Sequence, residues 1–265
     1  MRARRFAEPE VITMKTCLVA NLGLVEYGAA REIERRLVAA RKAGAMPDVL
    51  LLCEHPHVIT QGRAGQKQNL LASERVLAQM GVSYFDTDRG GDVTYHGPGQ
   101  LVAYPILQLG EIRRDVGWYV RQLEEAMIRA SADFGVASAR VAGMTGVWAA
   151  PRGASERAAE KQFEKLGAIG VHISRWVTSH GLAYNVATDL RYFDLIVPCG
   201  LAGRRATSLE KLLDRAVSVE EVAPRMAQHL GEVLGLEMRD ATVAEIERRL
   251  REFETSLESQ AQGVA

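Results

Sequence analysis

Hydrophobic and polar positions follow two different periods along this chain, which predicts a protein of mixed helices and strands. The run DVLLLC at 48–53 is apolar at nearly every position, so we expect a strand buried on both faces. Apolar side chains recur every third or fourth position over 115–134, which predicts an amphipathic helix. Segments of the two kinds interleave along the chain, as they do in α and β folds with one main core.

The other predicted elements follow from the same patterns and from turn signals between them. Strands are expected at residues 16–22, 82–86, 101–109, 145–149, 166–173 and 180–186, and helices at 25–43, 70–80, 218–234 and 242–258. Pro105 predicts an edge or bulged position for its strand, because proline has no backbone N–H to donate. Ser218 followed by Glu221 is typical of a capping box at a helix start.

The chain shows no internal repeat and no linker rich in Pro, Gly or Ser. We therefore expect a flexible N-terminal lead-in at 1–15, a main domain at 16–215 and a helical C-terminal portion at 216–265. The polar, Ala-rich segment 151–162 is expected to be an exposed loop or a short helix.

Composition narrows the possible functions. The 265 residues include 33 Lys plus Arg and 33 Asp plus Glu, and this zero net charge argues against a general nucleic-acid binder. No apolar stretch reaches the roughly 18 residues that a spanning helix needs, and the basic N-terminus lacks the apolar core of a secretory signal. An odd count of 3 cysteines fits a reducing compartment, so a cytoplasmic location is expected.

The densest chemical signal is RGGDVTYHGPGQ at 89–100. Its glycines and proline predict a loop whose backbone can approach a ligand closely. Arg89 offers a forked cationic donor, and Thr94, Tyr95 and His96 offer further polar groups. The segment indicates one wall of a binding site, although a tight structural turn would have the same composition.

A second signal is Pro198-Cys199-Gly200, which follows an apolar run. A cysteine between proline and glycine is expected at a sharp chain reversal, where its thiol can be exposed. Cys17 and Cys53 lie inside apolar strand-like runs and are expected to be inert. Cys199 is therefore the candidate nucleophile.

A nucleophilic thiol needs a neighbour that favours the thiolate. His96, His172, His180 and Lys165 are the candidates. Lys165 opens an apolar, glycine-containing strand, where a partly desolvated ammonium could exchange protons near neutral pH. Spacing along the chain leaves the choice among them open.

Cys53, His55 and His57 would share one face of a continued strand, which is a pattern that metal sites use. Pro56 interrupts that strand, and no fourth ligand lies near in sequence. We therefore expect a loop leading into the site and no metal.

Three motifs follow one another along the chain: RGGDVTYHGPGQ at 89–100, KLGAIGVHISRWVTSHGLAYNV at 165–186 and DLRYFDLIVPCGL at 189–201. Together and in this order, they closely resemble the lipoyl(octanoyl) transferases of lipoate biosynthesis. The resemblance covers roughly residues 18–213, and the longer segment 151–162 departs from it. It implies an α+β fold like that of the biotin and lipoate protein ligases, with a mixed β-sheet flanked by helices and a smaller second sheet.

The resemblance also implies functional residues. Cys199 would accept the acyl group, with Lys165 as its partner in a Cys/Lys dyad. The implied acyl-binding residues are Arg89, Gly90, Gly91, Asp92, Val93, Thr94, Tyr95, His96, Ala168, Ile169, Gly170, Gly181, Leu182 and Ala183.

The implied reaction moves an octanoyl or lipoyl group from acyl carrier protein to a lysine of lipoyl domains. Those domains belong to 2-oxoacid dehydrogenase complexes and the glycine cleavage H protein. No cofactor, metal, nucleic acid or membrane is implied, and the thioester donor makes ATP unnecessary. The acyl chain needs an apolar tunnel, so we expect enlargement of Gly181 to shorten the preferred chain.

Three alternatives stay open. An ATP-dependent lipoate or biotin ligase would share the fold but would not need a nucleophilic cysteine. A noncatalytic lipoyl-domain binding protein would not need Cys199 and Lys165 together. A Cys/His thioesterase would use His96 or His180 as its base.

Acyl carrier proteins are strongly acidic, so the resemblance requires a local basic patch within the balanced total charge. The candidates near the motifs are Arg63, Lys67, Arg89, Arg204 and Arg205. If they serve, binding of the carrier should weaken with salt.

Overall fold

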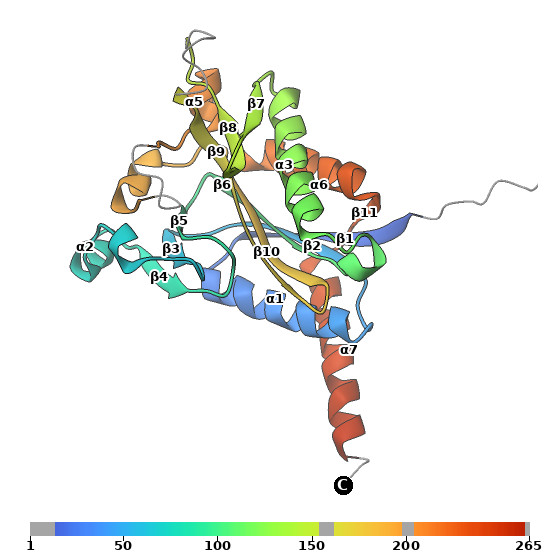
Figure 1. Cartoon of the computed structure of the whole chain (residues 1–265). Helices are drawn as coiled ribbons and strands as arrows, with labels where there is room; N and C mark the ends of the chain where they lie inside the picture. The colour runs from blue at the N-terminus through green and yellow to red at the C-terminus, as the bar shows by residue number, and fades with distance from the viewer. Residues whose placement is uncertain (1–13, 154–161, 198–203, 263–265) are drawn as a thin grey trace, which may run out of the picture.

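The computed structural model describes residues 14–153, 162–197 and 204–262, which form three layers (Figure 1). A large mixed sheet is the middle layer. Helices α1 (Tyr27–Lys42) and α7 (Val243–Gln262) cover one face, and α3 (Val116–Asp133) and α6 (Val219–Leu234) cover the other. This arrangement confirms the α+β fold class.

The large sheet of the described residues has the strand order β11-β1-β2-β6-β10-β9-β8-β7. Its strands are β1 Lys15–Leu24, β2 Asp48–Glu54, β6 Gln100–Ile106, β7 Ser138–Val141, β8 Met144–Ala149, β9 Glu164–Ser174, β10 Val177–Asn185 and β11 Leu236–Asp240. Strand β1 runs parallel to both of its neighbours, and the other pairs are antiparallel. The expected burial of the DVLLLC strand on both faces is confirmed, because every residue of β2 except Glu54 is buried.

A smaller sheet with the order β4-β3-β5 lies beside the large one. Its strands are β3 Val58–Gln61, β4 Ser83–Asp86 and β5 Val93–His96, and α2 (Glu74–Gln79) packs against it through Leu77. The remaining short helices are η1 Lys67–Asn69, η2 Leu109–Glu111, η3 Leu190–Leu195 and α5 Leu209–Leu213. The second sheet is the one that the family resemblance implies.

The two helices on one face start at polar caps. The Asp115 carboxylate accepts from Trp118 N at 2.9 Å and begins α3, and Ser218 Oγ accepts from Glu221 N at 3.3 Å and begins α6. A buried stripe of α3, including Tyr119, Leu123 and Met127, then packs on the sheet and on α6. Position 218 therefore caps its helix as expected.

The prediction of an edge or a bulged position for Pro105 is wrong, because β6 lies between β2 and β10 and its pairing with them shows no shift of register. Pairing of β6 with β10 ends at Ala103. Beyond it, Thr178 Oγ1 donates to Pro105 O at 2.6 Å and accepts from Leu107 N at 2.8 Å. A side-chain hydroxyl thus spans the gap that proline leaves in an interior strand.

Several other helices and strands differ from the predicted ones. Strand β5 lies inside the segment expected to be a loop, and the predicted helix at 70–80 is shortened to α2 after the single turn η1. Strands β7 and β11 were not predicted, since both are short edge strands with polar residues. The C-terminal portion, expected to be helical, therefore also adds a strand to the sheet.

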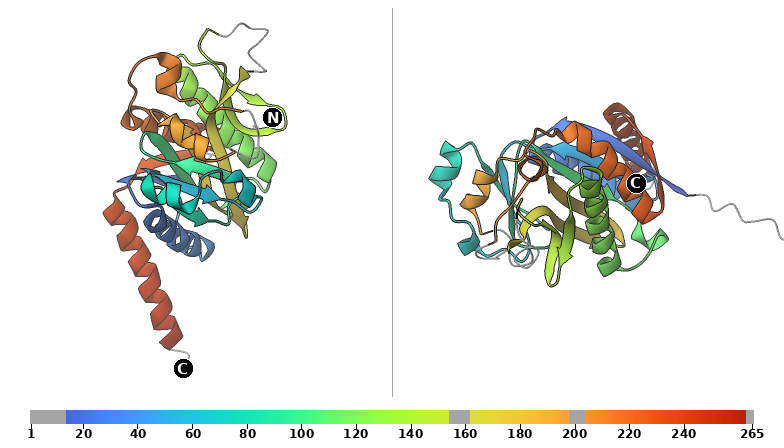
Figure 2. Two further views of the ribbon diagram at one scale, coloured as in Figure 1. Left: turned by 90° about the vertical axis from the view of Figure 1, so that its left-hand side faces the viewer. Right: turned by 90° about the horizontal axis from the view of Figure 1, so that it is seen from above.

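Helix α7 continues away from the body of the molecule (Figure 2), and most of its side chains beyond Leu250 are exposed. Within the described ranges, no helix combines the length and apolar character that a bilayer span requires. Most of the N-terminal lead-in and of segment 151–162 lies outside those ranges.

Candidate active site

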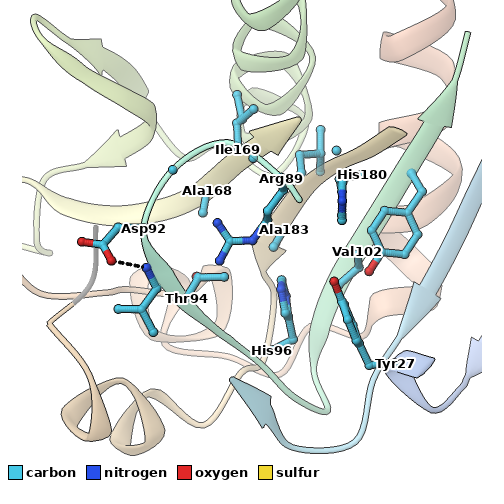
Figure 3. A pocket seen from close by; sticks show the side chains of 16 residues that line it. Tyr27, Arg89, Asp92, Thr94, His96, Val102, Ala168, Ile169, His180 and Ala183 are labelled. Atoms are coloured by element: carbon cyan, nitrogen blue, oxygen red, sulfur yellow. Dashed lines mark hydrogen bonds between the residues drawn. The ribbon is translucent and has the colours of Figure 1, made fainter. Parts of the chain in front are cut away.

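A pocket lies between the small sheet and strands β6, β9 and β10 of the large sheet (Figure 3). Its lining comes from α1, from the segment 89–96, from β6 and from the hairpin strands β9 and β10. The residues are Tyr27, Arg89, Gly91, Asp92, Val93, Thr94, His96, Val102, Tyr104, Ala168, Ile169, Gly170, His180, Gly181, Leu182 and Ala183. Two motifs that are far apart in sequence thus form facing walls of one pocket.

All residues that the resemblance implies for acyl binding line this pocket except Gly90 and Tyr95. Strand β5 explains Tyr95, because alternate side chains point to opposite faces. Thr94 and His96 face the pocket, whereas Tyr95 is fully buried in the core of the small sheet and its hydroxyl bonds His57 Nδ1 at 2.7 Å. Gly90 lies next to the pocket, where its N–H donates to Val171 O of β9.

Arg89 ties this loop to the small sheet. Its Nη2 donates to Thr60 O at 2.6 Å, its Nε donates to Thr60 Oγ1 at 3.2 Å, and only 7% of the residue is exposed. Arg89 therefore cannot present its charge to the surface of an acidic protein. Arg89 therefore does not belong to the candidate basic patch, whereas Arg63, Lys67 and Arg205 are exposed and can contribute to it.

Lys165 lies on β9 at the edge of a second pocket that adjoins the first. The two pockets share Thr94, Ala168 and Ala183. Lys165 is half-buried, and its ammonium lies 4.8 Å from the centre of the Trp148 ring. This contact places a cation over an aromatic face at the mouth of an apolar pocket.

The chain that follows the Pro-Cys-Gly motif returns to Lys165. Lys165 N donates to Arg205 O at 2.8 Å, and Thr207 N donates to Lys165 O at 2.9 Å. Arg204, Arg205 and Ala206 line the same pocket as Lys165. Cys199 itself lies outside the described residues.

Hydrogen bonds connect this return segment to His96. Asn185 Nδ2 donates to Thr207 O, and Gln100 Nε2 donates to Asn185 Oδ1, each at 2.9 Å. Gln100 Oε1 is then the acceptor for His96 Nδ1 at 2.7 Å, so the neutral imidazole keeps its lone pair on Nε2. Burial holds the pKa of His96 at about 3, and the ring is therefore neutral near pH 7.

A partly buried polar network closes the opposite side of the pocket. His180 has a left-handed backbone (φ 56°) within β10, and its N–H donates to the fully buried Glu34 of α1. His180 Nε2 bonds Asp88 Oδ1 at 2.7 Å, and Arg31 Nη2 donates to the same oxygen at 2.9 Å. Burial lowers the pKa of His180, which therefore donates as a neutral ring.

Several pocket residues were not among the predicted site residues. Tyr27, Val102 and Tyr104 come from α1 and β6, outside the three motifs, and Trp148 comes from β8. The local sequence around each of them is typical of an ordinary core residue. Only the packing of distant elements brings these residues to the site. The left-handed His180 is invisible in sequence for the same reason.

The expected role of Gly181 needs correction. A Cβ on Gly181 would lie 2.0 Å from Ala103 O and 2.7 Å from Pro105 Cδ. The glycine therefore allows β6 and β10 to approach each other, and a larger residue would push the backbone apart before it narrowed the pocket.

His55 and His57, whose spacing resembles that of metal ligands, make other contacts. His55 Nε2 bonds Tyr104 OH at 2.8 Å, and the His57 ring stacks on Tyr192 with 4.1 Å between centroids. In the part of the chain that the structure describes, no group of three or more His, Cys, Asp or Glu is arranged to hold a metal ion.

Comparison with known proteins gives the family. The sequence profile of the lipoyl protein ligase A/B catalytic domain matches residues 26–231. The chain belongs to this family. It is 50% identical over 225 residues to an octanoyltransferase of Solibacter usitatus, covering 85% of this chain and 96% of that protein. An octanoyltransferase of Chloroflexus aurantiacus is 49% identical over 232 residues, covering 87% of this chain and 100% of that protein.

These relatives make this lipoyl protein ligase A/B family member an acyltransferase of the octanoyltransferase type. Solved structures support the fold. A bipartite lipoate protein ligase from Thermoplasma acidophilum superimposes with a TM-score of 0.67 at 16% identity, covering 91% of this chain and 92% of that one. Lipoate-protein ligase A bound with ATP gives a TM-score of 0.63 at 16% identity, covering 91% and 94%.

Proposed function

We propose that this acyltransferase moves an octanoyl group from acyl carrier protein, through a thioester on Cys199, to a lysine of lipoyl domains. The lipoyl domains of 2-oxoacid dehydrogenase complexes and the glycine cleavage H protein are the proposed acceptors, and the cytoplasm is the proposed location. The observation that carries the proposal is the position of Lys165. It lies in the second pocket, which adjoins the first, beside the segment that follows the Pro-Cys-Gly motif.

The first pocket, which we call the acyl pocket, is suited to an acyl chain. Val102, Ile169 and Leu182 supply hydrocarbon surface, and Ala168 and Ala183 leave room between the sheets. At about 0.8 kcal/mol for each buried CH₂, most of the affinity for an octanoyl group would come from this burial. Arg89 is held by Thr60 and Gly90, so it stabilises the loop that forms the pocket wall.

The chemistry then needs two acyl transfers. The Cys199 thiolate attacks the thioester carbonyl of the carrier, a new C–S bond forms, and the carrier leaves as a thiol after taking a proton from Lys165. The acceptor amine next attacks the enzyme thioester, the amide C–N bond forms, and the Cys199 thiolate leaves. Lys165 accepts the proton that the amine releases. The amide is more stable than either thioester, which makes the transfer directional without ATP.

Lys165 distinguishes this mechanism from a Cys/His thioesterase. Burial lowers the pKa of His96 to about 3 and also lowers the pKa of His180, so both rings are weak bases. Lys165→Ala and Lys165→Arg should therefore each lower kcat/KM by at least about 100-fold, since guanidinium does not release its proton near neutral pH. Lys211→Arg is the matched control, because Lys211 is a half-exposed neighbour paired with Glu164.

A transfer assay with octanoyl carrier protein and an apo lipoyl domain, without ATP, makes the comparison. Near wild-type turnover of both Lys165 variants would contradict the dyad. Modification of the lipoyl domain from free octanoate only when ATP is added would instead support a ligase.

A further inference from the structure

An open groove adjoins the acyl pocket and reaches Lys165 from the surface. It shares Gly91, Asp92, Ile169 and Gly170 with the acyl pocket and shares Lys165 with the second pocket. A molecule lying in this groove would have one end beside Lys165 and the other at the protein surface.

Neutral hydrogen-bonding side chains line the groove. Gln66, Gln68 and Asn69 form one wall at η1, and Thr145 of the β7–β8 hairpin lies on the other. The Asp92 carboxylate is occupied within the wall, where it accepts from Gln66 N at 3.2 Å, from Val93 N at 2.7 Å and from Asn69 Nδ2. Gln68 Nε2 donates to Gln66 Oε1 at 2.6 Å. The amide atoms outside these bonds, the Thr145 hydroxyl and apolar side chains such as Val120 and Met144 form the lining between the two ends of the groove.

Two exposed cations adjoin groove residues along the chain, and we call them the rim of the groove. Arg63 directly precedes Ala64, and Lys67 stands between Gln66 and Gln68. A ligand suited to this surface has a negative charge at its outer end, amide and hydroxyl groups along a thin middle, and a reactive group at its inner end.

We propose that the groove binds the phosphopantetheine arm of the acyl carrier protein. This inference rests on the proposed function, which supplies a carrier-bound thioester as donor. The arm's phosphate would lie toward Arg63 and Lys67, its two amides along the carboxamide wall, and its thioester beside Lys165. The acceptor lysine fits less well, because its side chain is a short aliphatic stem with a single cationic group and no amide.

The test compares three donors that carry the same octanoyl group on successively smaller thiols. They are octanoyl carrier protein, octanoyl-pantetheine, and the octanoyl thioester of ethanethiol, which has no amide. Gln68→Ala and Thr145→Val should each lower kcat/KM for the first two donors about fivefold, as expected for one lost hydrogen bond. Both should leave the ethanethiol thioester unchanged. Gln228→Ala, an exposed glutamine on α6, is the matched control.

The rim is tested by charge reversal. Lys67→Glu should lower kcat/KM for octanoyl carrier protein about tenfold and should flatten its salt dependence, but it should not affect octanoyl-pantetheine, which lacks the phosphate. Arg251→Glu on the exposed part of α7 should change neither donor.

Two results would overturn the inference. Equal losses with all three donors would show that the groove residues act on structure or chemistry. A change confined to KM for the lipoyl domain would assign the groove to the acceptor. In both cases the wild-type enzyme still transfers octanoyl groups, whereas failure of wild type with every donor would refute the proposed function itself.

Discussion

Individual residues of the pocket divide into those that shape the space and those that hold its walls. Ala168 and Ala183 line both the acyl pocket and the pocket of Lys165. Arg89 and His180 are instead buried, and their hydrogen bonds hold the segment 89–96 and β10 in place. Chain-length preference should therefore respond to the alanines and not to Gly181, which allows two strands to approach each other.

Ala168→Leu should change the preferred acyl chain. The added carbons fill space where the acyl pocket meets the Lys165 pocket, so the kcat/KM ratio of octanoyl to hexanoyl carrier protein should fall about tenfold, as expected when roughly two methylenes lose their burial. Ala78→Leu, on the exposed face of α2, should leave the ratio unchanged. An unchanged ratio in folded Ala168→Leu would contradict this pocket assignment.

Gly181→Val should behave differently, as a stability variant. Its side chain would force β6 and β10 apart, so the free energy of unfolding should fall by about 3 kcal/mol. Urea denaturation measures this loss. A fully stable Gly181→Val enzyme that prefers a shorter acyl chain would contradict this prediction. It would support the expectation from sequence that Gly181 sets the length of the pocket.

At the scale of elements, strong periodic patterns predicted helices and strands correctly. They did not predict elements that depend on pairing with a distant strand. The apolar run of β2 and the stripe of α3 were predictable because burial on both faces, or on one helical face, leaves a clear pattern. Strand β5 was hidden because its pairing with β3 overrides the flanking glycines. The strand prediction at Pro105 was wrong because the Thr178 hydroxyl satisfies the backbone groups Pro105 O and Leu107 N where the pairing of β6 with β10 ends.

Helix α6 offers a test of an element start. Its cap is Ser218, and the helix covers one face of the large sheet through Val222, Met226 and Leu230. Ser218→Ala should lower the free energy of unfolding by about 1 kcal/mol, the usual effect of losing such a cap. Ser256→Ala is the control, since this exposed hydroxyl in α7 only donates to a carbonyl of its own helix. Equal effects of the two substitutions in urea denaturation would contradict the capping role.

At the scale of the whole molecule, the site lies between two sheets, and no single segment contains it. Ordered motifs in the sequence indicated the facing walls at 89–96 and at β9 and β10. Tyr27, Val102 and Trp148 could not be recognised in advance, because each joins the site only through tertiary packing. The zero net charge likewise gave no sign that Arg89 would be buried while Arg63 and Lys67 stay exposed.

Buried neutral histidines near the pocket make global stability depend on pH. Burial lowers the pKa of His55, His96 and His180 in the folded protein, and for His96 the value is about 3. Below about pH 6.5 the unfolded chain therefore binds protons that the folded chain does not. The free energy of unfolding consequently decreases as the pH decreases.

His96 alone should lower the free energy of unfolding by about 1.4 kcal/mol for each pH unit below about 6.5, until its folded pKa is reached. Urea denaturation at about pH 7.5 and about pH 5.5 measures the loss, and His96→Gln should reduce it. Equal stability of the wild-type protein at the two pH values would contradict this prediction. Asp88 does not contribute in this window, because its lowered pKa acts only below about pH 4.

The central claim is that octanoyl groups pass through Cys199, and intact-protein mass spectrometry tests it most directly. After mixing with octanoyl carrier protein in the absence of acceptor, wild-type enzyme should gain the mass of one octanoyl group. Peptide fragmentation should place that group on Cys199, addition of an apo lipoyl domain should remove it, and Cys199→Ser should gain none. A wild-type enzyme that gains no acyl group, or one acylated equally well without Cys199, would contradict the account.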